Sequence, residues 1–259
     1  MNITIPMARC TVALAAAFAV GGAHAETKPD GQWRGNGGAA AAFTSGNSSP
    51  STLSLAIDMA RATAEDKISL GGNVNYGKSK SAGVTTTNTD KWAGFGQYDW
   101  NLSPKLFVFG KLGLEGDKVA KLDLRSLVAA GVGYKIVDTK ELSFSVFGGA
   151  AYSTDKYSVA QTIGGKTDTR FSRSSLFVGE ESAHQLTAST TFKQRLELYP
   201  GMSGDKALIA KFNAGLAVAM SGTVSLNVGV TDTYNSKPPA GQKKNDVGVF
   251  TGVNVKLGS

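Results

Sequence analysis

The sequence predicts an all-β fold, an antiparallel transmembrane β-barrel of about 12 strands, and three observations support it. Apolar and polar residues alternate through segments of about ten residues, the length that a tilted strand needs to cross a membrane. The connections alternate between short and long, as in barrels with both termini in the periplasm. Charged residues inside the segments fall mostly in the polar phase, which avoids the cost of facing lipid.

The start of the chain has the features of a secretory signal peptide. A polar start with Arg9 precedes an apolar run from Val12 to Val20, and Ala23, His24 and Ala25 form a small-residue cleavage site. The apolar run is too short for the roughly 20 residues of a spanning helix. The expected division is a signal peptide over 1–25, a short N-terminal segment over 26–32 and an outer-membrane β-barrel over 33–259.

Composition excludes several classes of function. Cys10 is the only cysteine and lies in the signal, so disulfides and thiolate metal sites are not expected in the mature chain. Removal of Arg9 lowers the formal net charge from +7 to +6. The basic residues are scattered rather than gathered into a patch with aromatics, so we expect no nucleic-acid partner.

In the first half of the chain, the second strand separates its two phases most clearly. There Leu53, Leu55 and Ile57 oppose Thr52 and Ser54. The fifth strand is ambiguous, because its phenylalanines share the phase of a lysine. The strands expected in this half are 33–44, 51–62, 67–77, 89–100, 105–115 and 122–136.

In the second half, the last strand alternates best. Val249, Val253 and Val255 oppose Asn254 and Lys256. The eighth strand is the weakest, because its aromatic and charged residues do not sort by parity. The strands expected in this half are 141–153, 171–182, 184–199, 206–220, 223–235 and 245–257.

The connections and the aromatic residues indicate how the strands sit in a bilayer. Long outer loops are expected at 78–88, 154–170 and 236–244, and short periplasmic turns at 63–66, 101–104, 137–140 and 221–222. Aromatic residues near strand ends are expected to form interfacial girdles. These residues are Trp33, Tyr76, Trp92, Trp100, Tyr134, Tyr152, Tyr199 and Tyr234.

The polar residues that alternate with the apolar ones are expected to face the lumen. They include nine basic residues and four acidic ones, Asp58, Asp99, Asp123 and Glu197, so the lumen is predicted to be basic. An open lumen of this kind should favour anions. The alternative is that the charges pair and fill a closed core, and the strand number does not decide between the two. The expected lumen-facing basic residues are Arg34, Lys91, Lys111, Arg125, Lys135, Lys193, Arg195, Lys211 and Lys256.

The sequence shows no catalytic set. His184 is the only histidine after the signal and is expected at a periplasmic turn. A hydrolase site with Ser182 and Glu180 is conceivable, but a polar turn histidine is about ten times more common than such a site. Glu180 and Glu181 lie on opposite strand faces and make a poor metal cage. We therefore expect no enzyme activity, no catalytic residues, no cofactor and no metal.

Short motifs in a fixed order cover nearly the whole mature chain. They are Trp33 with Gly35; Ser45, Gly46, Asn47; Tyr98 and Asp99 before Leu102 and Ser103; Leu122 to Arg125; Gly131 to Tyr134; Gln194 to Glu197; Tyr234 to Ser236, Pro238 and Pro239; and Lys244 to Asp246. In these motifs the chain resembles domain-of-unknown-function family 481, described as salt-induced outer membrane proteins. The resemblance implies an outer-membrane barrel and no catalytic residues. The chain departs from many such barrels in ending on Leu257, Gly258 and Ser259 without a terminal aromatic residue.

The resulting hypothesis is a monomeric barrel of the bacterial outer membrane, acting as a narrow porin-like pore with a basic lumen or as a stress-related envelope component. Two alternatives belong to other classes, a lipid-acting enzyme near His184 and a surface-binding module that uses the long outer loops. The expected partners are outer-membrane lipid, lipopolysaccharide and the barrel-insertion machinery.

Overall fold

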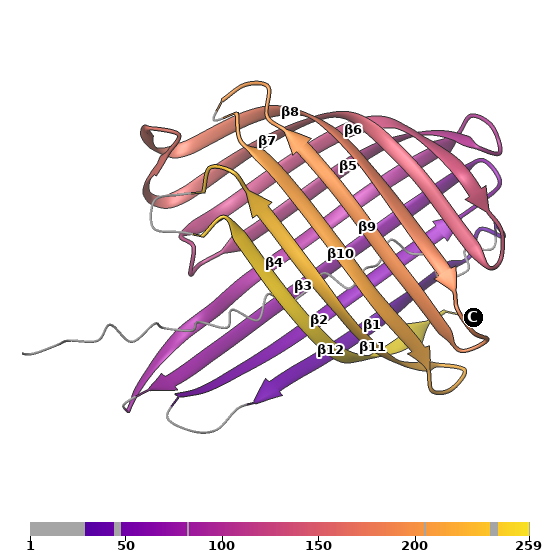
Figure 1. Ribbon diagram of the computed structural model, residues 1–259, viewed down its shortest axis with the longest axis horizontal. Helices are drawn as coiled ribbons and strands as arrows, with labels where there is room; N and C mark the ends of the chain where they lie inside the picture. The colour runs from indigo at the N-terminus through magenta and orange to yellow at the C-terminus, as the bar shows by residue number, and fades with distance from the viewer. Residues whose placement is uncertain (1–28, 44–47, 82, 205, 239–242, 259) are drawn as a thin grey trace, which may run out of the picture.

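A computed structural model describes residues 29–43, 48–81, 83–204, 206–238 and 243–258 of the chain. The expected signal peptide lies outside these residues. Twelve antiparallel strands form a closed barrel, which confirms the predicted fold class (Figure 1). The strands are β1 (Trp33–Phe43), β2 (Ser48–Ala62), β3 (Asp66–Ser81), β4 (Val84–Asn101), β5 (Leu106–Asp117), β6 (Leu122–Asp138), β7 (Leu142–Ile163), β8 (Lys166–Gln185), β9 (Thr190–Pro200), β10 (Leu208–Ala219), β11 (Val224–Asn235) and β12 (Asn245–Leu257).

Each strand pairs with its neighbours in sequence, and β1 pairs with β12 to close the sheet. Gly35 lies opposite Leu257 and Ala39 opposite Val253 across this seam. Closure gives every strand two neighbours in the sheet. We call the end that holds Trp33 and Leu257 the terminal end, and the opposite end the hairpin end. Across the described residues, no helix is long and apolar enough to cross a membrane.

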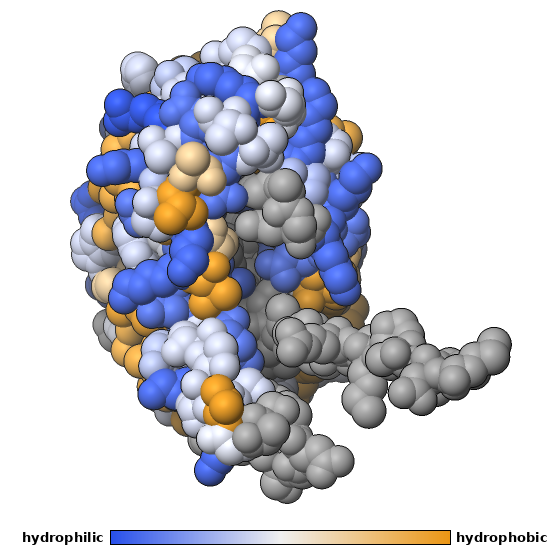
Figure 2. Space-filling view, turned by 90° about the vertical axis from the view of Figure 1, so that its left-hand side faces the viewer, coloured by the Kyte–Doolittle hydropathy of each residue, from blue (hydrophilic) through white to orange (hydrophobic). Residues whose placement is uncertain are grey.

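The apolar phase of the strands faces outward, as the alternation predicts. Val74, Leu112 and Val249 are each more than half exposed, and comparable side chains surround the barrel. Figure 2 views the hairpin end, where hydrophilic side chains gather, while hydrophobic residues lie along the flanks. An apolar surface of this extent is far larger than the patches on soluble monomers. Such a surface fits the hydrocarbon core of a membrane instead.

Aromatic side chains project outward near both ends of the barrel. Trp100 and Tyr134 are exposed towards the terminal end, and Trp92 and Tyr152 towards the hairpin end. The prediction for Tyr199 is wrong, because this residue is only 8% exposed and packs inside the barrel. Tyr199 lies two residues after the inward-facing Glu197 in β9. Because alternate residues of a strand face the same side of the sheet, Tyr199 faces the lumen rather than the outer surface.

Two of the predicted long outer loops are instead strands. β3 and β4 continue through most of 78–88, and β7 and β8 through most of 154–170. The second hairpin turns on Gly164 and Gly165, which both have positive φ angles, as a two-residue hairpin turn requires. Thr162 and Thr167 hydrogen-bond across its strands at 2.8 Å. Polar, β-branched residues therefore extend the sheet beyond the barrel where composition alone indicated loops.

Inside the barrel, an aromatic cluster covers the wall formed by β5 to β9. Its members are Phe107, Phe109, Ala129, Phe147, Ala151, Phe177 and Tyr199. Phe109 meets Phe147 edge to face at 6.2 Å between ring centroids, and Phe177 stacks on Tyr199 at 5.5 Å. The inward glycine Gly179 leaves room for one ring, because a Cβ there would lie 2.6 Å from the Phe147 ring. The cluster occupies part of the lumen along this wall.

Gly179→Ala is expected to destabilise the barrel by about 1 to 3 kcal/mol, because the added methyl group must displace Phe147 or the backbone of β9. Gly110→Ala is the matched control, since a Cβ at Gly110 would meet no atom within 4 Å. Urea unfolding of the refolded protein in micelles measures both effects. Equal stability of the two variants would show that the glycine is not needed for ring packing.

Candidate functional site

A cavity of about 1090 Å³ extends along the lumen. Thr63 and Glu65 line it at the terminal end, and Lys237 and Lys244 at the hairpin end. Its lining includes 11 basic and 9 acidic residues among the described part of the chain, a difference of +2. The lumen therefore contains a cavity, and the charges of the residues that line it are nearly balanced. The sequence, in contrast, predicted a clear excess of basic residues.

The middle of the lumen is organised around Arg195 on β9. Its guanidinium donates to Glu181 on β8 and, at 2.7 Å, to Glu197 on its own strand. The guanidinium carbon also lies 4.6 Å from the centre of the Phe147 ring, a cation–π arrangement. One arginine thus engages two carboxylates and fixes them against the aromatic cluster.

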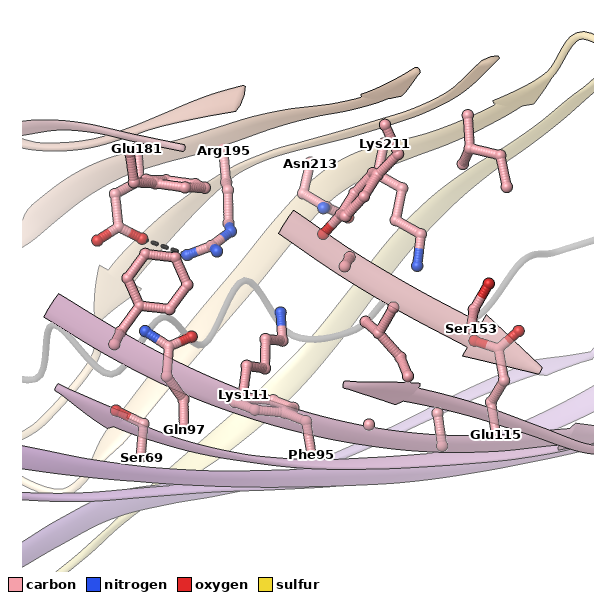
Figure 3. A pocket seen from close by; sticks show the side chains of 18 of the residues that line it. Ser69, Phe95, Gln97, Lys111, Glu115, Ser153, Glu181, Arg195, Lys211 and Asn213 are labelled. Atoms are coloured by element: carbon pink, nitrogen blue, oxygen red, sulfur yellow. Dashed lines mark hydrogen bonds and ion pairs between the residues drawn. The ribbon is translucent and has the colours of Figure 1, made fainter. Parts of the chain in front are cut away.

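Lys111 and Lys211 enter the same part of the cavity from opposite walls, β5 and β10 (Figure 3). Lys111 Nζ lies 3.9 Å from Glu197 Oε1 and 5.4 Å from the centre of the Phe95 ring. Among the described residues, Lys211 makes no ion pair within 4 Å, although Glu197 is its neighbour across the β9–β10 ladder. These two ammonium groups are the cations at mid-lumen that are least tightly bound to carboxylates.

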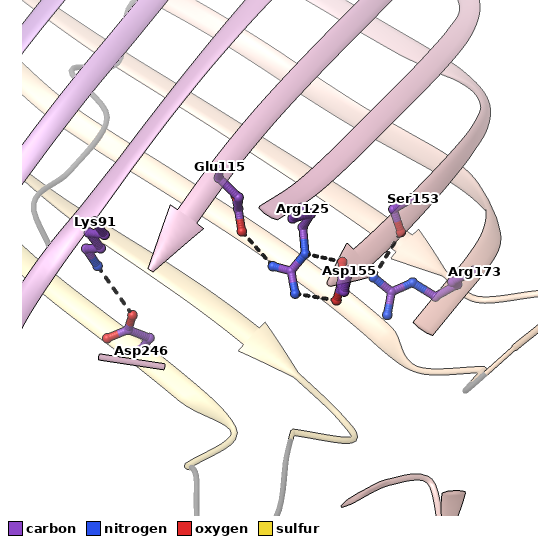
Figure 4. Close-up of polar contacts among 7 residues, drawn as sticks. All are labelled: Lys91, Glu115, Arg125, Ser153, Asp155, Arg173 and Asp246. Carbon is purple, nitrogen blue, oxygen red and sulfur yellow. Dashed lines mark hydrogen bonds and ion pairs between the residues drawn. The ribbon is translucent and has the colours of Figure 1, made fainter. Parts of the chain in front are cut away.

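A second network lies towards the hairpin end and is centred on Arg125 (Figure 4). Arg125 donates to Glu115 at 2.6 Å and, through two nitrogens, to both oxygens of Asp155 at 2.6 Å. The two-nitrogen contact is the bidentate arrangement that gives arginine–carboxylate pairs their strength. This network ties β5, β6 and β7 together at the base of the β7–β8 hairpin.

Further lysines line the cavity between the Arg125 network and the mouth at the hairpin end. Lys91 on β4 lies 3.9 Å from Asp246, and both line the cavity (Figure 4). Lys243 and Lys244 line it farther out, in the connection before β12. Leu122, Tyr157 and Ile163 form an apolar cluster that also lines the cavity, and the last two belong to the β7–β8 hairpin.

The structure places most of the basic residues expected in the lumen along the cavity. Lys91, Lys111, Arg125, Lys135, Arg195 and Lys211 line it.

The other three are not among the residues that line this cavity. Arg34 is buried and donates to Asp30 at 2.8 Å, which holds the pKa of the Asp30 carboxyl well below its usual range. Lys193 is half-buried in β9, in the phase of Arg195. Lys256 is exposed at the end of β12, opposite Asn36.

The sequence reasoning missed several charged residues that line the cavity, among them Glu115, Asp155, Arg173 and Glu181. Asp155 fell in the expected loop, and Arg173 and Glu181 belong to the poorly patterned eighth strand. Glu115 lies four residues after Lys111 and so faces the same side of β5, which was the signal for it in the sequence. Conversely, Asp123 is exposed in a β-bulge between Leu122 and Leu124 and does not line the cavity.

The residues considered for catalysis lie on β8 rather than at a turn. Glu180, Ser182 and His184 alternate on the outward phase, and Glu180 accepts a 3.5 Å hydrogen bond from Gln194. The Ser182 hydroxyl is buried and has no hydrogen-bond partner among the described residues, while the His184 ring lies 6.1 Å from that of Phe192. The expected turn position of His184 is wrong, because β8 continues to Gln185. In the described residues, no group of three metal-ligating side chains is placed to hold an ion.

Comparison with known proteins gives the family and a likeness of fold. No curated protein matches the chain. Among solved structures, the chain is similar to a NanC porin, with 10% identity, coverage of 87% of this chain and 98% of that one, and a TM-score of 0.46. It is also similar to an outer membrane channel from Pseudomonas putida F1, with 11% identity, coverage of 88% and 95%, and a TM-score of 0.46.

A third similar structure is the translocator domain of the autotransporter NalP from Neisseria meningitidis, with 12% identity, coverage of 86% and 87%, and a TM-score of 0.46. The family model described as "Protein of unknown function, DUF481" matches residues 37–257, and the family expected from the motifs is thereby confirmed. The chain belongs to this family of proteins of unknown function.

Proposed function

We propose that the protein is an outer-membrane β-barrel that acts as a narrow passive pore for small solutes and favours anions. The observation that supports this most is the lumen cavity, whose lining residues run from the terminal-end turns to the hairpin-end mouth. The apolar outer surface supports a bilayer location, because only closed barrels and helices satisfy their backbone groups in hydrocarbon. The salt induction implied by the motif resemblance stays a prediction.

The preference for anions follows from how the charges are paired rather than from their number. Glu115, Asp155 and Glu181 are each held by an arginine at 2.5 to 2.6 Å. Lys111 and Lys211 reach into the cavity with only long or no ion pairs among the described residues. A carboxylate neutralised by a close guanidinium presents little field to a passing ion, whereas a hydrated ammonium group attracts anions.

The test is conductance of the refolded protein in a planar bilayer under a potassium chloride gradient. We expect small, ohmic channels and a reversal potential of the sign set by chloride flow. A folded barrel that shows no conductance would contradict the pore and leave the fold standing. Folding is checked separately by the altered gel mobility of the unheated protein, so an inactive preparation is distinguished from an impermeable barrel.

A further inference from the structure

The outer wall of β7 and β8 changes in character along the barrel axis. On the outward phase, Leu176 and Val178 are about half exposed and apolar, and Tyr152 follows towards the hairpin end. Beyond Tyr152, Thr154 and Ser172 share a 3.3 Å hydrogen bond between their hydroxyl groups. This order of hydrocarbon, aromatic and polar groups is that of a membrane–water interface, with Tyr152 at the headgroup level.

One step farther out, two cations face each other directly. Lys156 lies opposite Arg170 in the β7–β8 ladder, and both side chains are exposed. The adjacent residues Asp155 and Phe171 are in the inward phase, where Asp155 binds Arg125 and Phe171 packs against Tyr157. Lys156 and Arg170 therefore project outward, towards the lipid side of the wall.

Like charges directly opposite each other in antiparallel strands are destabilising unless a counter-charge is present. Within the part of the chain that the structure describes, no side chain makes an ion pair with Lys156 or Arg170. Asp168 is the carboxylate nearest to Arg170 in sequence, and Lys166 binds it at 2.8 Å. The paired cations, with two hydroxyl groups beneath them, thus have the composition of a site for an external anion.

We propose that Lys156 and Arg170 bind the phosphate of a phosphorylated glycolipid in the outer leaflet. Arginine offers a planar fork and lysine a point charge, a combination suited to a phosphate oxygen set. The site lies just above the aromatic level, where lipid phosphates are found, and Leu124, opposite Lys156 in the β6–β7 ladder, offers apolar contact beside it. The inference rests on the outer-membrane location proposed above but does not require the barrel to be a pore.

The test uses the full chain refolded in detergent, with bound lipid counted by native mass spectrometry. The probe is bisphosphorylated lipid A, compared with the same lipid after phosphatase treatment and with inorganic phosphate. We expect the double variant Lys156→Gln/Arg170→Gln to bind lipid A at least about tenfold more weakly. Phosphatase treatment is expected to weaken binding to the wild type by a similar factor.

The matched control is Lys243→Gln/Lys244→Gln, which removes two positive charges at the same end of the barrel, from residues that line the cavity. It should bind lipid A within twofold of the wild type. The exchange Lys156→Arg/Arg170→Lys should retain binding, which guards against a folding defect in the glutamine variant. Equal binding by the glutamine variant or by dephosphorylated lipid would overturn the site, as would inorganic phosphate binding as tightly as lipid A. Loss of conductance with binding retained would contradict only the pore.

Discussion

In the proposed pore, replacing Lys111 and Lys211 by glutamate is expected to turn the preference for anions into a preference for cations. The two ammonium groups extend from opposite walls into one section of the cavity, where both act on an ion in that section. Glu197, the carboxylate next to both lysines, is already engaged by Arg195 at 2.7 Å. Reversal of both lysines therefore reverses the sign of the local field.

The expected size of this effect follows from Coulomb interactions in a wet lumen. A unit charge about 4 Å from an ion contributes about 1 kcal/mol in water. Because about 1.4 kcal/mol corresponds to a factor of ten, reversing both charges should change the anion-to-cation permeability ratio at least about tenfold. The reversal potential under a potassium chloride gradient should change sign, and the change should shrink as ionic strength rises.

Two further variants separate a lumen effect from a general charge effect. Lys111→Gln/Lys211→Gln should give a ratio between those of the wild type and the glutamate variant. Lys105→Glu/Lys140→Glu makes the same change in net charge at exposed turns of the terminal end, outside the residues that line the cavity. An equal shift of selectivity in this control would show that the lysines at mid-lumen do not determine it.

Strand phase was predictable because lipid-facing and lumen-facing positions differ in polarity. Leu53, Val228 and Val249 were assigned correctly to the outer wall from alternation alone. Alternation fails where the lumen itself is apolar, as at Phe107 and Phe177, because parity cannot distinguish a ring that fills the barrel from one that faces lipid. This is why the pattern of the fifth and eighth strands is irregular in the sequence although both are continuous strands.

The charge of the lumen was less predictable than its outline. Asp155 was assigned to a loop because the expected β7 ended at 153, whereas the strand continues to Ile163. Glu181 was obscured by the mixed pattern of β8. With Glu115, three carboxylates that bind arginines were therefore left out of the balance. Strand ends are the positions that local pattern defines least well, and here they decide which charges enter the barrel.

The network around Arg125 gives the largest expected effect on stability. Arg125→Gln should lower the free energy of unfolding by about 3 kcal/mol, because Glu115 and Asp155 would lose the guanidinium that neutralises both. All three side chains are less than a third exposed, so water replaces the lost contacts only in part. Urea unfolding in micelles, followed by tryptophan fluorescence, measures the change.

A triple variant distinguishes the loss of a stabilising contact from the creation of unpaired charge. Glu115→Gln/Arg125→Gln/Asp155→Asn removes the cation together with both carboxylates, so it should recover most of the stability lost in Arg125→Gln. Lys118→Gln is the matched control, since Lys118 is 83% exposed beside Asp90 and its removal should change stability by less than about 0.5 kcal/mol. If the triple variant stayed as unstable as Arg125→Gln, the charges would not be the cause, and the hydrogen bonds that join β5, β6 and β7 would have to account for the loss.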